Sequence, residues 1–343
     1  MESRKVQRLG PSTLATTLPA DWTAKNDVAK GDDLSLRLSD RGTITVFSKY
    51  ATAEDREITI AADPLDGEAL ERAIVAQYAL GRRVIQIETA GDTLRDEHVS
   101  AVQEAEKRLV GLGVIDETLE YVALRCSADP GDFSLPSLLG RLNTTATRMR
   151  TEAVLAFSNQ DSDRAAQVLN RERRANRIFV LILRLIFMAH SDLRLTETIG
   201  LDAGLPLVGY RSVAKNLELS ATTAEDVART VVDTGGTEVS DEITNQIREL
   251  NETVDDLTKL ALEATLDPDF SKSMHVRENF AAITDREREI LVNVPELSND
   301  EVLAIREVLV SLQRIAEYAM RNAEIAGNLS LNRGSEHLHI ESQ

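Results

Sequence analysis

The sequence lacks long uncharged apolar runs and almost lacks cysteine. Cys126 is the only cysteine, which excludes an intramolecular disulfide and fits a reducing compartment. The longest apolar stretch, residues 178–189, spans twelve positions and contains Arg184. A membrane-spanning helix needs about twenty such residues. No signal-type segment stands at the start of the chain. We therefore expect a cytoplasmic protein without a transmembrane segment.

Aromatic residues are also scarce. They make up 4% of the chain, and Trp22 is the single tryptophan. Because hydrophobic residues still reach 42%, Ala, Leu, Ile and Val must fill the core. Small aliphatic side chains of this kind favour helices that pack closely on one another. The 343 residues are enough for two or three domains.

The motifs of common enzyme classes are missing. The sequence contains no P-loop, nucleophile elbow, dinucleotide fingerprint or zinc-type Cys/His cluster. None of the five histidines has metal-motif spacing with a suitable partner: His98, His190, His275, His337 and His339. We therefore expect a protein that binds and not an enzyme.

Charge is abundant but unevenly distributed. The net charge is −18, yet the first fifty residues hold eight bases and six acids, a balance of +2. Because an acidic surface repels nucleic acid, this asymmetry indicates a separate N-terminal unit with a different partner. Lysine supplies only eight of the 39 bases. Many acids with few lysines are typical of a salt-rich cytosol, where acidic surfaces keep proteins soluble; an arginine-biased genome is the other explanation.

Residues 1–50 predict a small β unit. The alternation of apolar and polar residues predicts strands over 5–9, 14–18, 33–38 and 43–48, with a short helix over 20–26. Four strands of this size bury little surface alone. We therefore expect this unit to form a dimer.

Residues 55–128 predict a small α/β domain. Strands are expected over 57–61, 83–88 and 119–125, and helices over 67–80 and 96–109. The order βαβαβ favours a small α/β or ferredoxin-like layer.

The remainder of the chain predicts long helices, followed by a flexible tail over 331–343. The expected helices cover 136–159, 163–190, 206–234, 240–265, 270–293 and 299–329. Six helices of this length suit two three-helix bundles. A faint internal repeat supports two halves, because one helical stripe recurs 95 positions later. Its members are Leu217, Ala221, Ala224 and Ala228, repeated as Leu312, Ala316, Ala319 and Ala323.

The N-terminal unit resembles the SpoVT/AbrB superfamily. The residues that carry the resemblance are 4–10, 12–13, 17–19, Trp22, Val28, 30–32 and Gly42. The resemblance implies a homodimer in which two chains interleave swapped hairpins into one barrel. In DNA-binding relatives, bases of the first strand and of loops contact DNA. The matching positions here are Arg4, Lys5, Arg8 and Lys25. Such bases neutralise phosphates; in the alternative reading, the unit only dimerises.

The helical part, residues 133–330, resembles the PhoU family. The stretches that carry the resemblance are 171–177, 210–218 and 313–319, the last similar to the family's E-R-I-A-D signature. PhoU proteins are cytoplasmic negative regulators of phosphate uptake. They communicate with an ABC-type phosphate transporter and, in bacteria, with a sensor kinase. An AbrB-like head, an α/β insert and a PhoU-like body occur together in archaeal members.

The PhoU resemblance also implies a multinuclear cluster of Fe, Zn or Mn, held by E-x-x-x-D pairs. A spacing of four residues places two carboxylates on one helical face, within reach of one cation. This sequence keeps one carboxylate at each matching place: Glu172, Glu218 and Glu317. The other carboxylate of each pair is missing. Asn176 and Thr222 stand in place of the second carboxylate, and Gln313 stands in place of the first.

Three functional hypotheses remain open. The first is a phosphate-responsive PhoU-type regulator that dimerises and binds DNA. The second is an adaptor that binds no DNA and docks through its helices on a phosphate transporter or signalling protein. The third is an AbrB-type antitoxin. The long helical body argues against the third, because antitoxins usually carry a short, disordered tail.

Overall fold

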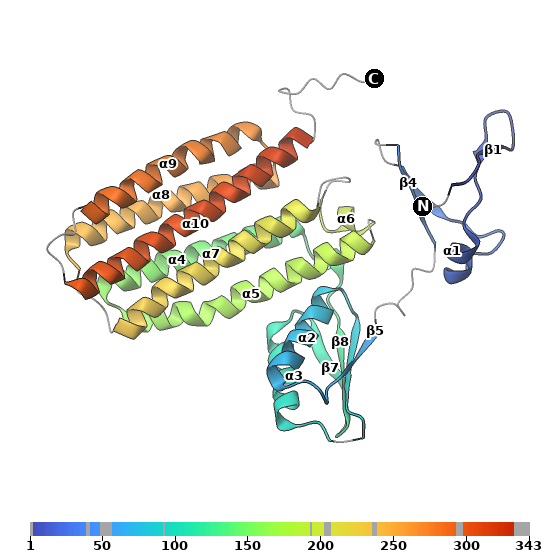
Figure 1. Cartoon of the computed structure of the whole chain (residues 1–343), viewed down its shortest axis with the longest axis horizontal. Helices are drawn as coiled ribbons and strands as arrows, with labels where there is room; N and C mark the ends of the chain where they lie inside the picture. Colours follow the sequence, from blue (N-terminus) through green and yellow to red (C-terminus); the bar gives the residue numbers. More distant parts are fainter. Residues whose placement is uncertain are drawn as a thin grey trace. The chain divides into compact units, whose positions relative to one another are not determined.

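The computed structural model describes residues 3–38, 42–48, 57–91, 93–192, 194–201, 207–234, 239–292 and 298–332. The chain divides into two compact units, Met1–Ile58 and Thr59–Gln343 (Figure 1). The predicted tail lies outside the described residues except for its first two positions.

The first unit is a small β region with one short helix. Strand β1 (Gln7–Arg8) pairs antiparallel with β2 (Leu14–Ala15), and β3 (Ser35–Leu38) pairs antiparallel with β4 (Ile44–Phe47). Helix α1 (Ala20–Lys25) follows Pro19, which cannot donate a backbone hydrogen bond and so suits a helix start. All five predicted elements are present, and the strands are shorter than predicted.

Apolar side chains of this first unit are exposed. Those that are at least 61% exposed are Val6, Leu9, Leu14, Leu36, Leu38 and Ile44. Among the apolar side chains that the structure describes before residue 48, none is buried. A single chain therefore provides no hydrophobic core for the described part of this unit.

The second unit begins with a four-stranded sheet in the order β5-β6-β8-β7. These strands are β5 (Glu57–Ala61), β6 (Val84–Glu88), β7 (Leu112–Glu117) and β8 (Tyr121–Cys126). Strand β8 pairs antiparallel with both β6 and β7. Strand β7 was not predicted, because most of its side chains are exposed and its register shifts between Val114 and Asp116. The resulting order βαβαββ is not the ferredoxin-like order, so that alternative is wrong.

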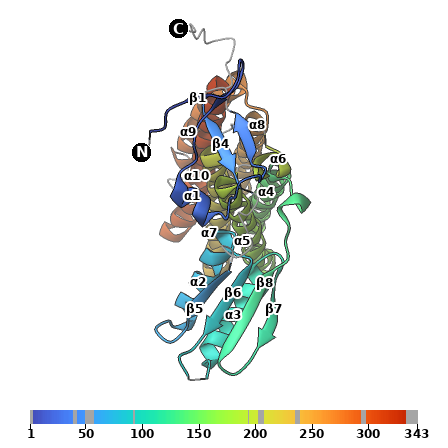
Figure 2. The ribbon, with the colours of Figure 1, turned by 90° about the vertical axis from the view of Figure 1, so that its right-hand side faces the viewer.

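Two helices pack on one face of this sheet (Figure 2). Helix α2 (Gly67–Ala79) starts after Asp66, whose carboxylate accepts a 2.7 Å hydrogen bond from the backbone N–H of Ala69. Helix α3 (Asp96–Arg108) packs beside it. The core of this layer is built from fully buried aliphatic and aromatic side chains: Leu70, Ile74, Tyr78, Ile85, Ile87 and Leu124.

The six predicted long helices are present and form two three-helix bundles. The first bundle contains α4 (Leu135–Asn159), α5 (Ser162–Ser191) and α7 (Leu207–Thr234). A short helix, α6 (Leu195–Thr198), lies between α5 and α7 in the chain and was not predicted. Asp161 caps α5 by accepting a hydrogen bond of 2.9 Å from the backbone N–H of Arg164.

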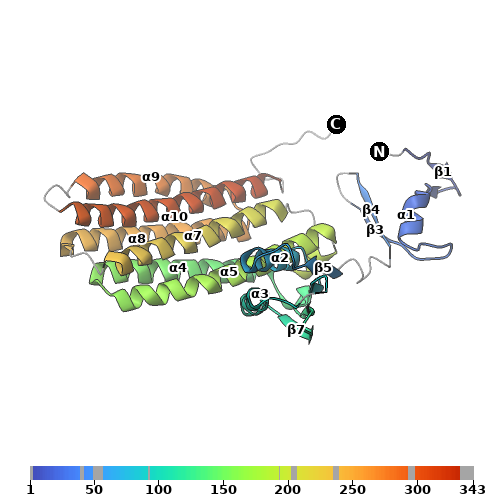
Figure 3. The same cartoon turned by 60° about the horizontal axis from the view of Figure 1, so that its bottom comes forward.

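The second bundle contains α8 (Asp241–Leu266), α9 (Phe270–Val292) and α10 (Asn299–Asn332). Helix α7 packs on α10, and α4 packs on α8, so the bundles share one core (Figure 3). The expected fold class is confirmed: the protein is mainly helical, with a pair of three-helix bundles that follow a small α/β layer in the chain. No helix in the described ranges is both long and apolar enough to cross a membrane.

The residues of the internal repeat lie in the hydrophobic core that the two bundles share. All eight repeat residues are buried, on α7 and on α10. The Asn216 amide donates a 2.8 Å hydrogen bond to Asn322 Oδ1 across the same pair of helices.

One buried arginine joins the two bundles. Arg150, on α4, is only 2% exposed, and its Nε donates to Asn251 Oδ1 on α8 at 2.9 Å. Its guanidinium also forms an ion pair with Asp255 of α8. Burial lowers the pKa of Arg150 to about 9. Such a charge is tolerated inside a protein only when it is paired and hydrogen-bonded.

A second buried arginine joins the α/β layer to the first bundle. Arg184, on α5, donates to the carbonyl oxygens of Tyr78 and Arg82 at 2.6 and 2.9 Å, at the C-terminal end of α2. Its guanidinium lies 4.8 Å from the centre of the Tyr78 ring. A cation at a helix C-terminus is stabilised by the helix dipole. Gly81 lies at this junction with a φ of +90°, and a Cβ there would be 2.6 Å from Met188 Cγ of α5. The layer and the bundle are therefore closely packed at this point.

Candidate functional sites

The predicted DNA-binding residues are exposed in the first unit. Arg8 lies on β1, with Arg4 and Lys5 just before it, and Lys25 lies in the last turn of α1. Arg8 Nη1 donates a long hydrogen bond of 3.5 Å to the Pro11 carbonyl. Three of the four bases thus follow one another along a single segment. An exposed row of bases can contact a phosphate backbone, and their role in DNA binding stays a prediction.

Two of the three predicted metal-binding carboxylates come together in the first bundle. Glu172 lies on α5 and Glu218 on α7. Burial raises the pKa of Glu172, and the nearby charges of Glu225 and Glu218 raise it further. Glu218 is buried, and its carboxylate forms an ion pair with Lys215, with 2.5 Å between Nζ and Oε2. Glu225 is paired with Arg229. Two of these three carboxylates, Glu218 and Glu225, are therefore already paired with a basic side chain of the protein.

Glu317 belongs to a different cluster, between α9 and α10 of the second bundle. Burial raises the pKa of Glu287 on α9, and the charge of Glu317 raises it further, whereas Arg288 lowers it. Gln313, which stands where the PhoU motif has a glutamate, directs its amide nitrogen to Glu287 Oε2 at 2.7 Å when the amide is oriented to donate. In this orientation Gln313 is a hydrogen-bond donor to the buried carboxylate of Glu287.

These side chains do not fit a multinuclear metal cluster. In the described ranges, no group of three or more His, Cys, Asp or Glu side chains is placed so that it could hold one metal ion. The remaining carboxylates of the E-x-x-x-D positions are divided between two bundles, and one of them, Glu218, already forms an ion pair with Lys215. No chemistry through a bound metal is therefore assigned here, and metal binding stays a prediction that elemental analysis can test.

Sequence analysis missed the partners of these carboxylates. Glu225 is seven positions after Glu218, so helical periodicity places both on one face of α7. That spacing could have identified it. Glu287 has no such signal, because its partners Glu317 and Gln313 lie on another helix, 30 and 26 positions away (317 − 287 and 313 − 287).

The structure defines a mainly helical protein with clusters of charged side chains between its helices. The family model of the PhoU domain matches residues 139–231. This range covers most of the first bundle, from α4 to α7. No curated protein sequence matches the chain significantly.

Two solved structures are similar to this chain. The first is PhoU from Pseudomonas aeruginosa, with 23% sequence identity and a TM-score of 0.48 over 59% of this chain and 96% of that one. The second is the phosphate transport system regulatory protein PhoU from Streptococcus pneumoniae, with 17% identity and a TM-score of 0.47 over 60% of this chain and 96% of that one.

Proposed function

We propose that the chain is a PhoU-type regulator of phosphate transport that acts in the cytoplasm by binding other molecules and not by catalysis. The match of the PhoU domain to residues 139–231 carries this proposal. The test is phosphate uptake by the source cells at high external phosphate. Cells without the protein should continue to take up phosphate that wild-type cells exclude. Equal uptake by both strains would refute the role.

The regulator is proposed to be a homodimer through its N-terminal unit. The six exposed apolar side chains on and beside β1, β2, β3 and β4 support this arrangement, because a second copy could cover them. The strand pairs are two to four residues long, so pairing within one chain stabilises them little.

DNA binding by this dimer is a further part of the proposal. It is supported by the exposed bases Arg4, Lys5, Arg8 and Lys25 in the first fifty residues, whose net charge is +2 in a chain of net charge −18. The test is binding to DNA at the salt concentration of the cell, for wild type and for the triple variant Arg4→Ala, Lys5→Ala and Arg8→Ala. A matched triple variant of exposed bases in the second unit, Arg148→Ala, Arg211→Ala and Arg314→Ala, is the control.

The two outcomes separate the regulator from the adaptor. If only the N-terminal variant loses affinity and its binding depends less steeply on salt, DNA is a specific partner. If wild type and both variants bind equally poorly, the adaptor alternative holds. The adaptor would dock through its helical faces on a phosphate transporter or a signalling protein.

A further inference from the structure

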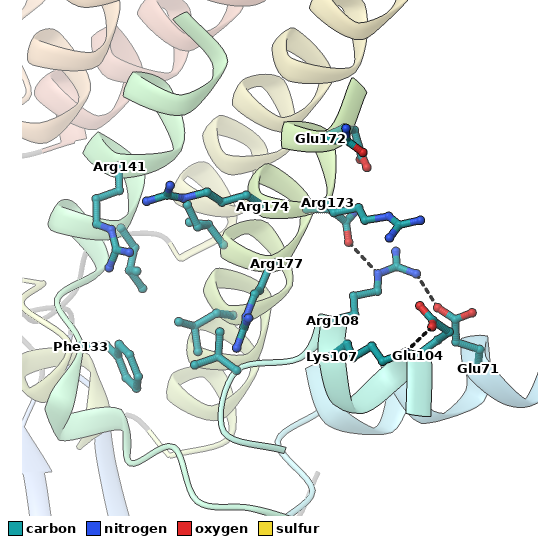
Figure 4. Close-up of a pocket in the computed structure, with 16 residues that line it drawn as sticks. Glu71, Glu104, Lys107, Arg108, Phe133, Arg141, Glu172, Arg173, Arg174 and Arg177 are labelled. Atoms are coloured by element: carbon teal, nitrogen blue, oxygen red, sulfur yellow. Dashed lines mark hydrogen bonds and ion pairs between the residues drawn. The ribbon is translucent and has the colours of Figure 1, made fainter. Parts of the chain in front are cut away.

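A cavity of about 960 Å³ lies between the α/β layer and the first helical bundle. Helices α2 and α3 form one wall, and α4 and α5 form the other (Figure 4). Six bases line it: Lys107, Arg108, Arg141, Arg173, Arg174 and Arg177. Three glutamates also line it, so the lining carries +3 (6 − 3) in a chain of net charge −18. The cavity is therefore a local exception to the acidic surface.

The glutamates are concentrated at one side of this cavity. Glu71 pairs with Arg108 at 2.8 Å, and Glu104 pairs with Lys107 at 2.9 Å, both on the side of α2 and α3. Arg108 Nε also donates to Asn176 Oδ1 at 3.0 Å. The third glutamate, Glu172, lies on α5 in the opposite wall, where four arginines outnumber it: Arg141, Arg173, Arg174 and Arg177. The acids thus neutralise α3 and leave the opposite wall positive.

Arg141, Arg174 and Arg177 form that positive wall. Arg174 and Arg177 are three positions apart on α5, and Arg141 reaches the same space from α4 (Figure 4). Among the described residues, no carboxylate forms an ion pair with any of the three. Guanidinium groups are planar and bind phosphoryl oxygens in pairs, so three of them around one space suit a ligand with several phosphoryl oxygens.

The same end of the cavity has an apolar floor. Phe133 is half-buried there, and Leu138, Ile178 and Leu181 are buried beside it. A bare phosphate ion would leave this floor and most of the volume unused. The volume falls within the range of pockets that bind small organic ligands, about 300 to 1,000 Å³. The ligand should therefore carry an apolar part as well as its charge.

The two walls are held in fixed positions. Arg184 joins α5 to the end of α2, and Arg108 joins α3 to Asn176 of α5. Because these contacts bridge the two walls, they fix the shape of the cavity, and a fixed shape lowers the entropic cost of binding.

We propose that this cavity binds a small organic anion of nucleotide size, with two or more phosphoryl groups on Arg141, Arg174 and Arg177 and an apolar ring system over Phe133. The cavity's chemistry is independent of the regulatory role proposed above. Binding in solution is accordingly the test, and it remains informative if the regulatory role fails.

Calorimetric titration of the full chain tests the assignment with ATP, tripolyphosphate and orthophosphate at constant ionic strength. The test variant is Arg174→Gln with Arg177→Gln. The control is Arg148→Gln with Arg211→Gln, which removes the same charge from exposed positions of α4 and α7 outside the cavity. A second test variant, Arg141→Gln, removes the third arginine of the same wall from α4, so the result does not depend on the two substitutions in α5. Thermal unfolding confirms that each variant is folded.

ATP should bind wild type and the control alike, and the Arg174/Arg177 variant roughly tenfold more weakly or worse. Tripolyphosphate should bind more weakly than ATP, and orthophosphate most weakly of the three. Equal ATP affinity for test and control variants would overturn the site. Absence of ATP binding to wild type at millimolar concentration would do the same. Tripolyphosphate that binds as tightly as ATP would overturn the role of the apolar floor.

Discussion

Arg150 and Arg184 are both buried arginines in long helices, but they contact different kinds of partner. Arg150 contacts a carboxylate and an amide on a neighbouring helix. Arg184 contacts backbone carbonyls and an aromatic ring. The sequence shows Arg184 inside an apolar run. It does not show the partners, because Tyr78 and Arg82 lie 106 and 102 positions earlier.

Replacing Arg150 tests the link between the bundles. Arg150→Ala leaves Asp255 and Asn251 without their partner, so the free energy of unfolding should fall by about 2 to 4 kcal/mol. The value is below that of a fully buried pair because Asp255 is 32% exposed. Replacement of the exposed Arg148 by alanine on the same helix should change the free energy of unfolding by no more than about 0.5 kcal/mol. Chemical denaturation measures both, and equal losses would contradict the structural role of Arg150.

Glu172 should make stability depend on pH. Its pKa in the folded protein is raised by burial and then by Glu225 and Glu218. The folded state therefore binds this proton more tightly than the unfolded state does. The contribution of this proton to the free energy of unfolding is complete below the ordinary glutamate pKa. It is lost as the pH rises through the raised pKa of the folded protein.

At pH 7, Glu172→Gln should accordingly be more stable than wild type, and the difference should shrink toward pH 4. Denaturation curves at several pH values measure this difference. The exposed Glu263→Gln is the control for removal of one surface charge. A difference that does not change with pH would contradict the raised pKa of Glu172 in the folded protein.

At the scale of elements, local signals were sufficient for the long helices and insufficient for one strand. Capping residues such as Asp161 and Ser240 precede helices whose apolar residues recur at helical spacing. Strand β7 lacks alternation, since its backbone is held by pairing with β8 and not by a buried face. The contacts between elements depend on how closely two segments approach in space. At Gly81, for example, the end of α2 lies close against Met188 of α5.

Gly81→Ala tests the packing of α2 on α5. Gly91 has a similar φ of +95° but open space around a Cβ, so Gly91→Ala reports backbone strain alone. Gly81→Ala adds the clash with Met188 and should cost about 1 to 3 kcal/mol more. Adding Met188→Ala should recover part of that difference. If the two glycine variants unfold at the same denaturant concentration, the close contact is not important for stability.

The carboxylate clusters of the helices predict the metal content of the purified protein. Lys215 already contacts Glu218, and Gln313 already contacts Glu287. We therefore expect less than one tightly held Fe, Zn or Mn per chain in elemental analysis. More than one per chain, lost in Glu172→Gln or Glu218→Gln, would show that the degraded motifs still bind a cluster.

At the scale of the whole molecule, the first unit should control the oligomeric state. Leu36→Asp with Leu38→Asp places two charges among its exposed apolar side chains, and should convert a dimer into a monomer in light scattering. Val208→Asp, which changes an exposed apolar residue of α7, should leave the mass unchanged. A double variant that stays dimeric would place the interface elsewhere.

The sequence alone determined which segments form the long helices, that the N-terminal unit differs in charge, and that the long helices form two halves. These features depend on local periodicity, capping and composition, which act over a few residues. Only the tertiary structure decided which charges meet. It divided the predicted carboxylates Glu172, Glu218 and Glu317 between two bundles, and it gathered Arg141, Arg174 and Arg177 around one cavity. Charge interactions depend on distance in space, and residues that lie far apart in the chain set those distances.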